Sequence, residues 1–310
     1  MRQATPEHLG ADAWLFTPPR AVRSGPGVTI SWWLKTKPRT ARLEILDSTG
    51  VVLRVWEPDT TPPERQQAAR QAGGAEGGEG GGPGTRTQWL PLAAGVSQLP
   101  WNLRTQPFVT FPGMIMWGVR SNAPAAPPGR YTVRLNADGR TLTAPIVVEH
   151  NPWIADVTDA DLQAQYAFSR QVRDRVNDAN AAVIEIRRVR SQLEDRLKQS
   201  TDARLRAAAD TLLANARAVE ERIYQVRNQS NQDPLNFPIK VNNRLANLMS
   251  MAERGDGPPT SNMPELFRIL SEELQGDLDR LTQVWSRDLA AVNAELARLA
   301  LPKVDPKGLP

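Results

Sequence analysis

The chain of 310 residues contains no cysteine and only two histidines. Without cysteine there can be no disulfide bonds, no thiolate nucleophile and no cysteine-based zinc site. His8 and His150 lie far apart in the sequence, and neither belongs to a cluster with the spacing of metal ligands. We therefore predict no metal site and no histidine-based catalysis.

Long apolar runs are also missing from the sequence. No stretch approaches the roughly 20 apolar residues that a membrane-spanning helix needs. The first ten residues lack the apolar core of a signal peptide. We expect the chain to have no transmembrane segment of its own.

No part of the sequence contains a cluster of charges of one sign. Residues 1–150 carry 16 Lys and Arg against 11 Asp and Glu, and residues 151–310 carry 22 against 23. Basic side chains alternate with acidic ones, which argues against nucleic acid as a partner. The acidic pairs Glu220-Glu221 and Glu272-Glu273 are adjacent in sequence, so on a helix their carboxylates point apart. We predict no catalytic residue and no cofactor.

The pattern of apolar and polar residues changes near residue 150 and divides the chain into two parts. Residues 26–150 contain short segments of alternating apolar and polar residues separated by Gly and Pro, a pattern typical of an all-β fold. Asp138-Gly139 is a two-residue hairpin signal. We predict an antiparallel β-sandwich of the immunoglobulin or fibronectin type, preceded by a connector at residues 1–25. The strands are expected at Val28–Leu34, Ala41–Leu46, Val51–Trp56, Trp89–Leu92 and Val96–Leu103, and within the aromatic stretch Leu99–Leu135 and the returning run that ends at Val148.

The segment Gly73–Gly84 interrupts this β pattern. Eight of its twelve residues are glycine and it can bury no apolar surface, so we predict a mobile loop within the sandwich. A phosphate-binding loop is disfavoured, because neither a Lys-Ser/Thr pair nor a helix follows.

The apolar spacing changes after residue 150 to steps of three and four residues, which predicts helices over 151–301. A cap at Thr158–Asp161 begins a helix of about 40 residues, and Ser200-Thr201-Asp202 caps a second. A short third helix surrounds Leu245–Met249, and a fourth runs from Ser261 or Asn262 to Leu299, with Leu266 and Ile269 on its apolar stripe. We predict an α+β multidomain protein in which an up-down helical bundle follows the sandwich, and residues 302–310 form a tail.

Several motifs of the aromatic stretch resemble a known family. Pro100-Trp101-Asn102-Leu103-Arg104, Pro112-Gly113, Trp117-Gly118 and the run Ala126–Leu135 are similar to the region that follows the β-propeller in bacterial sortilin-like, BNR-repeat proteins, often labelled glycosyl hydrolases. The propeller repeats themselves are absent. The resemblance implies an exported accessory module of sandwich and helices.

Tryptophan is the residue type that suggests a function. We expect Trp101 and Trp117 in the core, because strand-type alternation surrounds both. Trp32 and Trp33 must lie on opposite faces of one strand. Exposed tryptophans are enriched at interaction hot spots, so Trp14, Trp33 and Trp153 are the candidate partner contacts.

Two functional hypotheses follow. The first is a non-enzymatic, extracytoplasmic structural subunit that binds protein partners in a larger, membrane-embedded complex from the periplasmic side. A photosynthetic reaction centre with its light-harvesting antenna is the specific example. The second is the accessory C-terminal module of a propeller-type glycoside hydrolase or peptidase.

Overall fold

The computed structural model describes residues 5–59 and 88–307. The predicted glycine-rich loop at Gly73–Gly84 lies outside these ranges. The chain forms two compact units. The first comprises the described parts of Met1–Pro107, Ala123–Arg170 and Ala252–Pro259, and the second those of Phe108–Asn122, Gln171–Met251 and Thr260–Pro310. It is an α+β protein, and each unit is described by itself.

The first unit contains two β-sheets, one antiparallel and one mixed. The three-stranded sheet has the order β1-β3-β6 and the five-stranded sheet the order β2-β8-β7-β4-β5, with β2 parallel to β8. The bounds are α1 (Pro6–Gly10), β1 (Ala13–Leu15), β2 (Ala21–Val22), β3 (Val28–Leu34), β4 (Ala41–Leu46), β5 (Val52–Trp56), β6 (Gly95–Trp101), β7 (Gly129–Ala137) and β8 (Arg140–Glu149).

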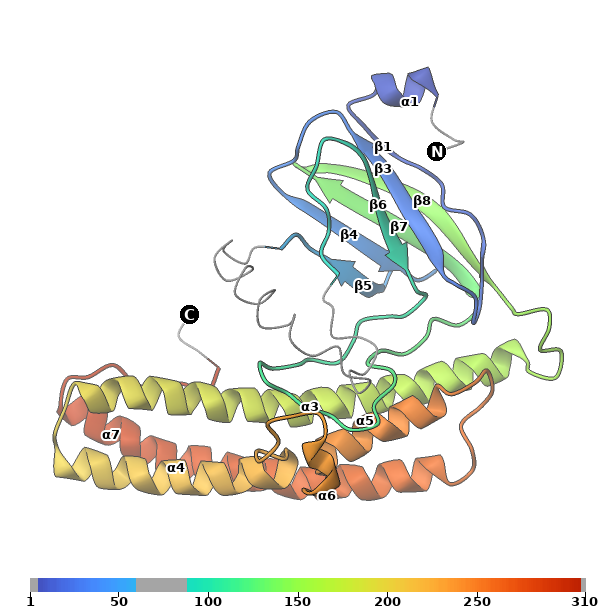
Figure 1. Ribbon diagram of the computed structural model, residues 1–310. Helices are drawn as coiled ribbons and strands as arrows, with labels where there is room; N and C mark the ends of the chain where they lie inside the picture. Colours follow the sequence, from blue (N-terminus) through green and yellow to red (C-terminus); the bar gives the residue numbers. More distant parts are fainter. Residues whose placement is uncertain (1–4, 60–87, 308–310) are drawn as a thin grey trace. The chain divides into compact units, whose positions relative to one another are not determined.

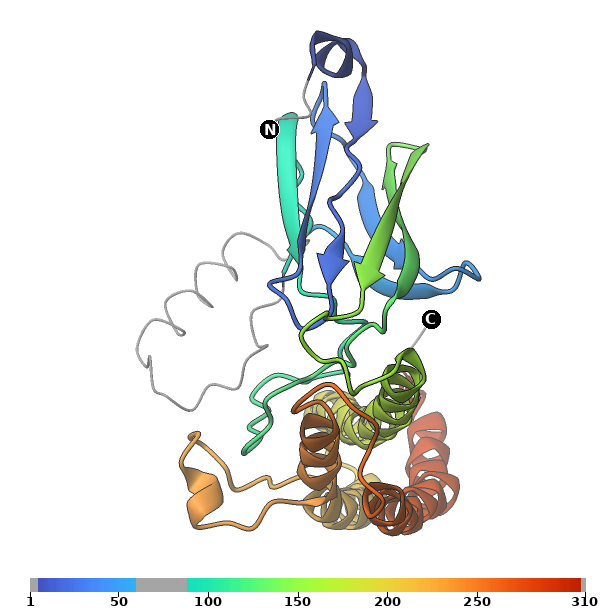
Figure 2. The same ribbon diagram turned by 90° about the vertical axis from the view of Figure 1, so that its right-hand side faces the viewer.

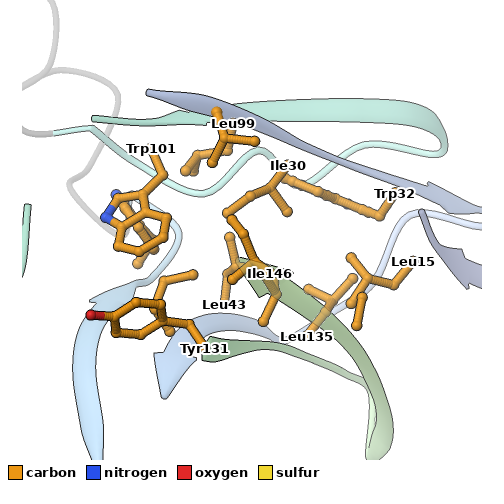
Figure 3. Close-up of a cluster of buried hydrophobic side chains, with 14 of the residues drawn as sticks. Leu15, Ile30, Trp32, Leu43, Leu99, Trp101, Tyr131, Leu135 and Ile146 are labelled. Carbon is orange, nitrogen blue, oxygen red and sulfur yellow. The ribbon is translucent and has the colours of Figure 1, made fainter. Parts of the chain in front are cut away.

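The two sheets share one apolar core. Alternate residues of β3, among them Ile30 and Trp32, are buried, and they face alternate residues of β4, β7 and β8 (Figure 3). Trp32 is 1% exposed, whereas its neighbour Trp33 is only partly buried, so the expectation of opposite faces is confirmed. Trp101 is also 1% exposed and packs edge-to-face on Tyr131.

The predicted hairpin at Asp138-Gly139 joins β7 to β8. Both residues have positive φ (46° and 80°), the backbone of a type I′ turn. The Asp138 carboxylate accepts hydrogen bonds from the backbone N–H groups of Arg39 and Thr40. The turn therefore fixes the register of the longest strand pair and also anchors the connection that precedes β4.

Two expectations about strands were wrong. Residues 89–92 form no strand, and neither do residues 108–122 within the aromatic stretch. The second of these segments belongs to the helical unit, where Trp117 is 36% exposed and not in a core. The compact units therefore differ from the predicted boundary at residue 150, because 108–122 groups with helices and 252–259 groups with the sheets.

The second unit is built from helices that lie side by side when viewed along their axes (Figure 2). A continuous helical run extends from α6 through a π-helical turn into α7, as the spacing predicted. The bounds are α3 (Asp159–Lys198), α4 (Ala203–Ile223), a 3₁₀ turn (Asp233–Leu235), α5 (Val241–Ala252), α6 (Met263–Val284), the π-helical turn (Trp285–Leu289) and α7 (Ala290–Arg298). Residues 159–170 of α3 fall in the first unit and the remainder in the second.

Both predicted helix caps are present. Thr158 Oγ1 accepts from the Asp161 N–H while the Asp161 carboxylate accepts from the Thr158 N–H at 2.9 Å. Asp202 accepts from the N–H groups of Arg204 and Leu205. On α6, however, Leu266 and Ile269 are 38% and 47% exposed, so the predicted apolar stripe is not buried in the first turns of that helix.

Side-chain amides on the helices hold the segment 108–122 by its backbone. Asn243 on α5 accepts from the Trp117 N–H at 2.7 Å and donates to the Trp117 carbonyl at 2.9 Å. Asn177 and Asn180 on α3 do the same for the two backbone groups of Val109. We call such a pair of bonds an amide clamp. The clamp explains why Trp117 can remain exposed, because the segment is fixed by its backbone and not by the indole.

Candidate interaction surface

Trp14 and Trp33 lie side by side on the outer face of the three-stranded sheet. They are direct cross-strand partners in the β1–β3 pair, and Val96 of β6 is the partner of Trp33 on the other side. Residues directly opposite in a sheet share a face. The structure therefore forms an aromatic row, defined as Trp14, Trp33 and Val96.

The aromatic row is only partly available to a partner. The His8 ring stacks on Trp14 with the ring centroids 4.3 Å apart, and the Trp33 indole N–H donates to the Ala11 carbonyl at 3.0 Å. Trp14 remains 37% exposed. His8 beside Trp14 and Val96 beside Trp33 were missed from the sequence, because only the position of α1 and the strand register bring them there.

Trp153 stands apart from the aromatic row, in the connection between β8 and α3. This connection lies at the end of the first unit opposite α1 (Figure 1). Trp153 is 91% exposed, the largest exposure among the large hydrophobic residues described. A folded protein gains nothing from leaving so large an apolar surface in water, so this side chain is a strong candidate for a binding contact.

The backbone that carries Trp153 is ordered by hydrogen bonds. The Asn151 side chain accepts from the Trp153 N–H at 3.1 Å, and the Asn151 carbonyl accepts from the Ile154 N–H. The His150 ring closes the connection, with Nδ1 2.9 Å from the Asn151 carbonyl and Nε2 2.7 Å from the Val157 carbonyl. Because carbonyl oxygens only accept, both contacts are hydrogen bonds when the imidazole carries both protons. The indole is thus displayed on a preorganised turn.

Three buried carboxylates each form ion pairs with two arginines. Glu44 is contacted by Arg42 and Arg134, Glu220 by Arg187 and Arg190, and Asp277 by Arg222 and Arg280. Burial would raise the pKa of Glu44, but the hydrogen bonds from Arg134 and Arg42 outweigh it and hold the pKa of this carboxyl below its usual value. These acids act as acceptors in structural ion pairs.

Among the basic side chains that the structure describes, Arg23 of the first unit is the most enclosed, at 3% exposure. It donates to Asp256, to the carbonyls of Ala125 and Ala126, and to the Gln165 side chain. We call this set the Arg23 node. It binds residues 252–259 to the sheets, which is why that segment belongs to the first unit.

Acidic pairs on helices separate as predicted. Glu220 is buried between two arginines of α3, whereas Glu221 pairs with Arg217 on α4 itself. Within residues 5–59 and 88–307, no group of three or more histidines and acids is placed to hold a metal ion. No helix of the described ranges is long and apolar enough to cross a membrane.

Comparison with known protein families found no match for this sequence, and comparison with curated proteins also found none. Among solved structures, the crystal structure of CopC from Methylosinus trichosporium OB3b matches at 14% identity with a TM-score of 0.21. The match covers 45% of this chain and 95% of that chain. A likeness at this level indicates nothing about the function of the present protein.

Proposed function

We propose that this chain is a non-enzymatic structural subunit that docks onto a larger protein assembly on the extracytoplasmic side of a membrane. The observation that carries the proposal is Trp153, an indole that is 91% exposed on a hydrogen-bonded turn. Aromatic anchors held in a fixed conformation lose little entropy on binding and dominate many interfaces. A periplasmic subunit of a photosynthetic reaction centre with its antenna is the specific assembly we propose.

The side chains of this turn and of the residues after it indicate which groups a partner surface would need. Asp156, Asp159 and Asp161 follow Trp153 within eight residues. A matching surface would therefore have an apolar pocket for the indole and a basic rim for the acids. The aromatic row offers a second, smaller contact.

The test is purification of the tagged full chain from its native host in mild detergent, followed by mass spectrometry and size-exclusion chromatography. We expect a defined set of membrane-complex proteins at constant stoichiometry with the wild type. Trp153→Ala should weaken the association by about 30-fold or more, the ~2 kcal/mol of a hot spot. The matched control is Val51→Ala, which truncates an apolar side chain that is 52% exposed in a turn. A wild-type chain that elutes alone would contradict the proposal.

The alternative function is an accessory module of a propeller-type hydrolase or peptidase. It is supported by the sequence resemblance around Trp101 and Ala126–Leu135. The same purification separates the two functions, because a propeller-containing enzyme as the stoichiometric partner would favour the alternative.

We also propose that the first unit has an immunoglobulin-like fold. In that fold, strands A, B and E form one sheet and strands G, F and C the other. The orders β1-β3-β6 and β2-β8-β7-β4-β5 correspond to A-B-E and A′-G-F-C-C′. A further likeness is Tyr131 near the start of β7, whose hydroxyl donates to the Pro127 carbonyl at 2.6 Å, as a tyrosine corner does.

For the second unit, we propose an up-down bundle of three long rods with α5 beside them. The short link between α3 and α4 favours antiparallel neighbours. Ion pairs from α3 to α4, and packing of α4 on α6 and α7, support this arrangement.

A further inference from the structure

The C-terminal segment of the second unit is held in an unusual way. We call Pro302–Lys307 the strap. Asn293 on α7 accepts from the Val304 N–H at 2.8 Å and donates to the Val304 carbonyl at 3.0 Å. Gln192 on α3 accepts from the Asp305 N–H at 3.1 Å and donates to the Asp305 carbonyl at 2.8 Å. Two amide clamps therefore hold consecutive residues of the strap.

Two arginines on the same face of α3 extend the contact. Arg188 donates to the Pro306 carbonyl at 2.8 Å and Arg196 to the Pro302 carbonyl at 3.0 Å. With Gln192 they stand at intervals of four residues, one stripe of the helix. Eight helical residues rise about 12 Å, and four extended residues span about 13 Å. The stripe thus matches the spacing of an extended peptide that runs antiparallel to the helix.

The site recognises backbone and one side chain. Val304 is 1% exposed, whereas Lys303 on one side is exposed and Asp305 on the other is half-buried. Pro302 and Pro306 have no N–H group to leave unpaired, and proline makes an extended segment cheaper to order. The ligand chemistry is therefore an extended, proline-flanked peptide with a small branched apolar side chain at its centre.

The link between α7 and the strap is strained. Ala300 has φ of 53°, in the left-handed region that favours glycine. The Leu301 N–H returns to the Leu296 carbonyl at 2.9 Å and completes the helix end. Release of the strap would allow Ala300 to leave this conformation.

We propose that Arg188, Gln192, Arg196 and Asn293 form a peptide-binding site, which the chain fills with its own strap and which accepts the same kind of segment from another chain. The strap is tethered and competes with such a segment at an effective concentration in the millimolar range. The site is independent of Trp153 and of the assembly proposed above.

The test measures, by fluorescence anisotropy, how tightly the full chain binds a fluorescent synthetic peptide with the sequence of residues 301–307. Val304→Asp places a charge where the strap is buried and should displace it. We expect this variant to bind the peptide about ten-fold more tightly than the wild type, because the internal competitor is removed. Lys303→Ala is the matched control, since Lys303 is exposed, and should bind as weakly as the wild type.

Adding Asn293→Ala to Val304→Asp should abolish peptide binding, and unchanged binding would show that the peptide binds elsewhere and overturn the proposal. A folded Val304→Asp chain that binds no peptide up to millimolar concentration also overturns it. If Val304→Asp fails to fold, amide hydrogen exchange of the wild type decides. The Val304 and Asp305 amides should exchange faster than those of Ile186 and Val189 in α3, and equal rates would refute an exchangeable strap.

Discussion

Replacement of Arg23 should destabilise the first unit more than any surface change. Its guanidinium donates to the Asp256 carboxylate at 3.2 Å, to the Ala126 carbonyl at 2.7 Å and to the Gln165 side chain at 2.6 Å. The side chains of Arg23 and Asp256 are 3% and 4% exposed. In Arg23→Met, an apolar chain of similar length fills much of the space but donates no hydrogen bond.

The magnitude follows from what the substitution leaves behind. Asp256 keeps one donor, the Ser24 hydroxyl at 2.7 Å, and remains an uncompensated buried charge. Breaking a buried ion pair by removing one partner costs about 3–5 kcal/mol. Since a whole domain is stable by only about 5–15 kcal/mol, Arg23→Met should remove a large share of the stability of this unit.

Urea denaturation followed by tryptophan fluorescence measures the effect. Seven of the nine tryptophans lie in the residue ranges of the first unit, so the signal reports mainly on it. At a slope near ~2 kcal/mol/M, a loss of ~4 kcal/mol lowers the midpoint by about 2 M urea. Arg20→Ala is the control, because its pair with Glu149 is exposed (76% and 41%) and should contribute 0 to ~1 kcal/mol.

A further variant separates the lost pair from lost packing. Adding Asp256→Asn to Arg23→Met removes the orphaned charge, so the double variant should be more stable than the sum of the single effects. A loss below ~1 kcal/mol for Arg23→Met would refute the reasoning, because it would mean that the Arg23 node contributes no more than a surface pair.

Three further predictions concern other sites. Burial raises the pKa of Tyr131, so the contribution of its hydroxyl to stability should be present below pH ~10 and decline as the pH rises further. Tyr131→Phe should flatten this decline in urea titrations at alkaline pH. The variant should also cost about 1 kcal/mol of stability, because the hydrogen bond to the Pro127 carbonyl is lost. The lowered pKa of Glu44 means that its stabilisation is present above pH ~4.5 and is lost as the pH falls, so Glu44→Gln should show a smaller acid-induced drop in the unfolding midpoint. Ala300→Gly should raise the thermal stability of the second unit by about 0.5–1 kcal/mol, because glycine adopts the left-handed backbone without strain, and an unchanged or lower melting temperature would contradict this.

The strands that sequence analysis located well are those in which apolar and polar residues alternate over most of the length. Val28–Leu34 and Ala41–Leu46 were predicted with their observed bounds, because this alternation is typical of a strand with one face on a core. The same reasoning placed Trp32 and Trp33 on opposite faces of β3. It could not find His8 and Val96 beside the tryptophans, because strand register and a short helix at the N-terminus bring them there.

Residue spacing correctly predicted where helices form, but it did not predict which of their apolar side chains are buried. The three- and four-residue spacing predicted one long run through α6 and α7, which is observed. It also predicted burial of Leu266 and Ile269, which are exposed. Periodicity identifies the apolar face of a helix, but whether a neighbour covers each turn depends on the lengths and positions of the other helices.

The segments 108–122 and 302–307 were not predictable, and the reason is common to both. Each has few regular backbone hydrogen bonds, and its N–H and C=O groups are paired with amides of Asn177, Asn180, Asn243, Asn293 and Gln192 on the helices. A buried backbone group must find a partner, but a helical asparagine carries no local sign of serving a distant segment. In the helical unit, these Asn and Gln side chains thus hold extended segments of the chain by their backbone groups.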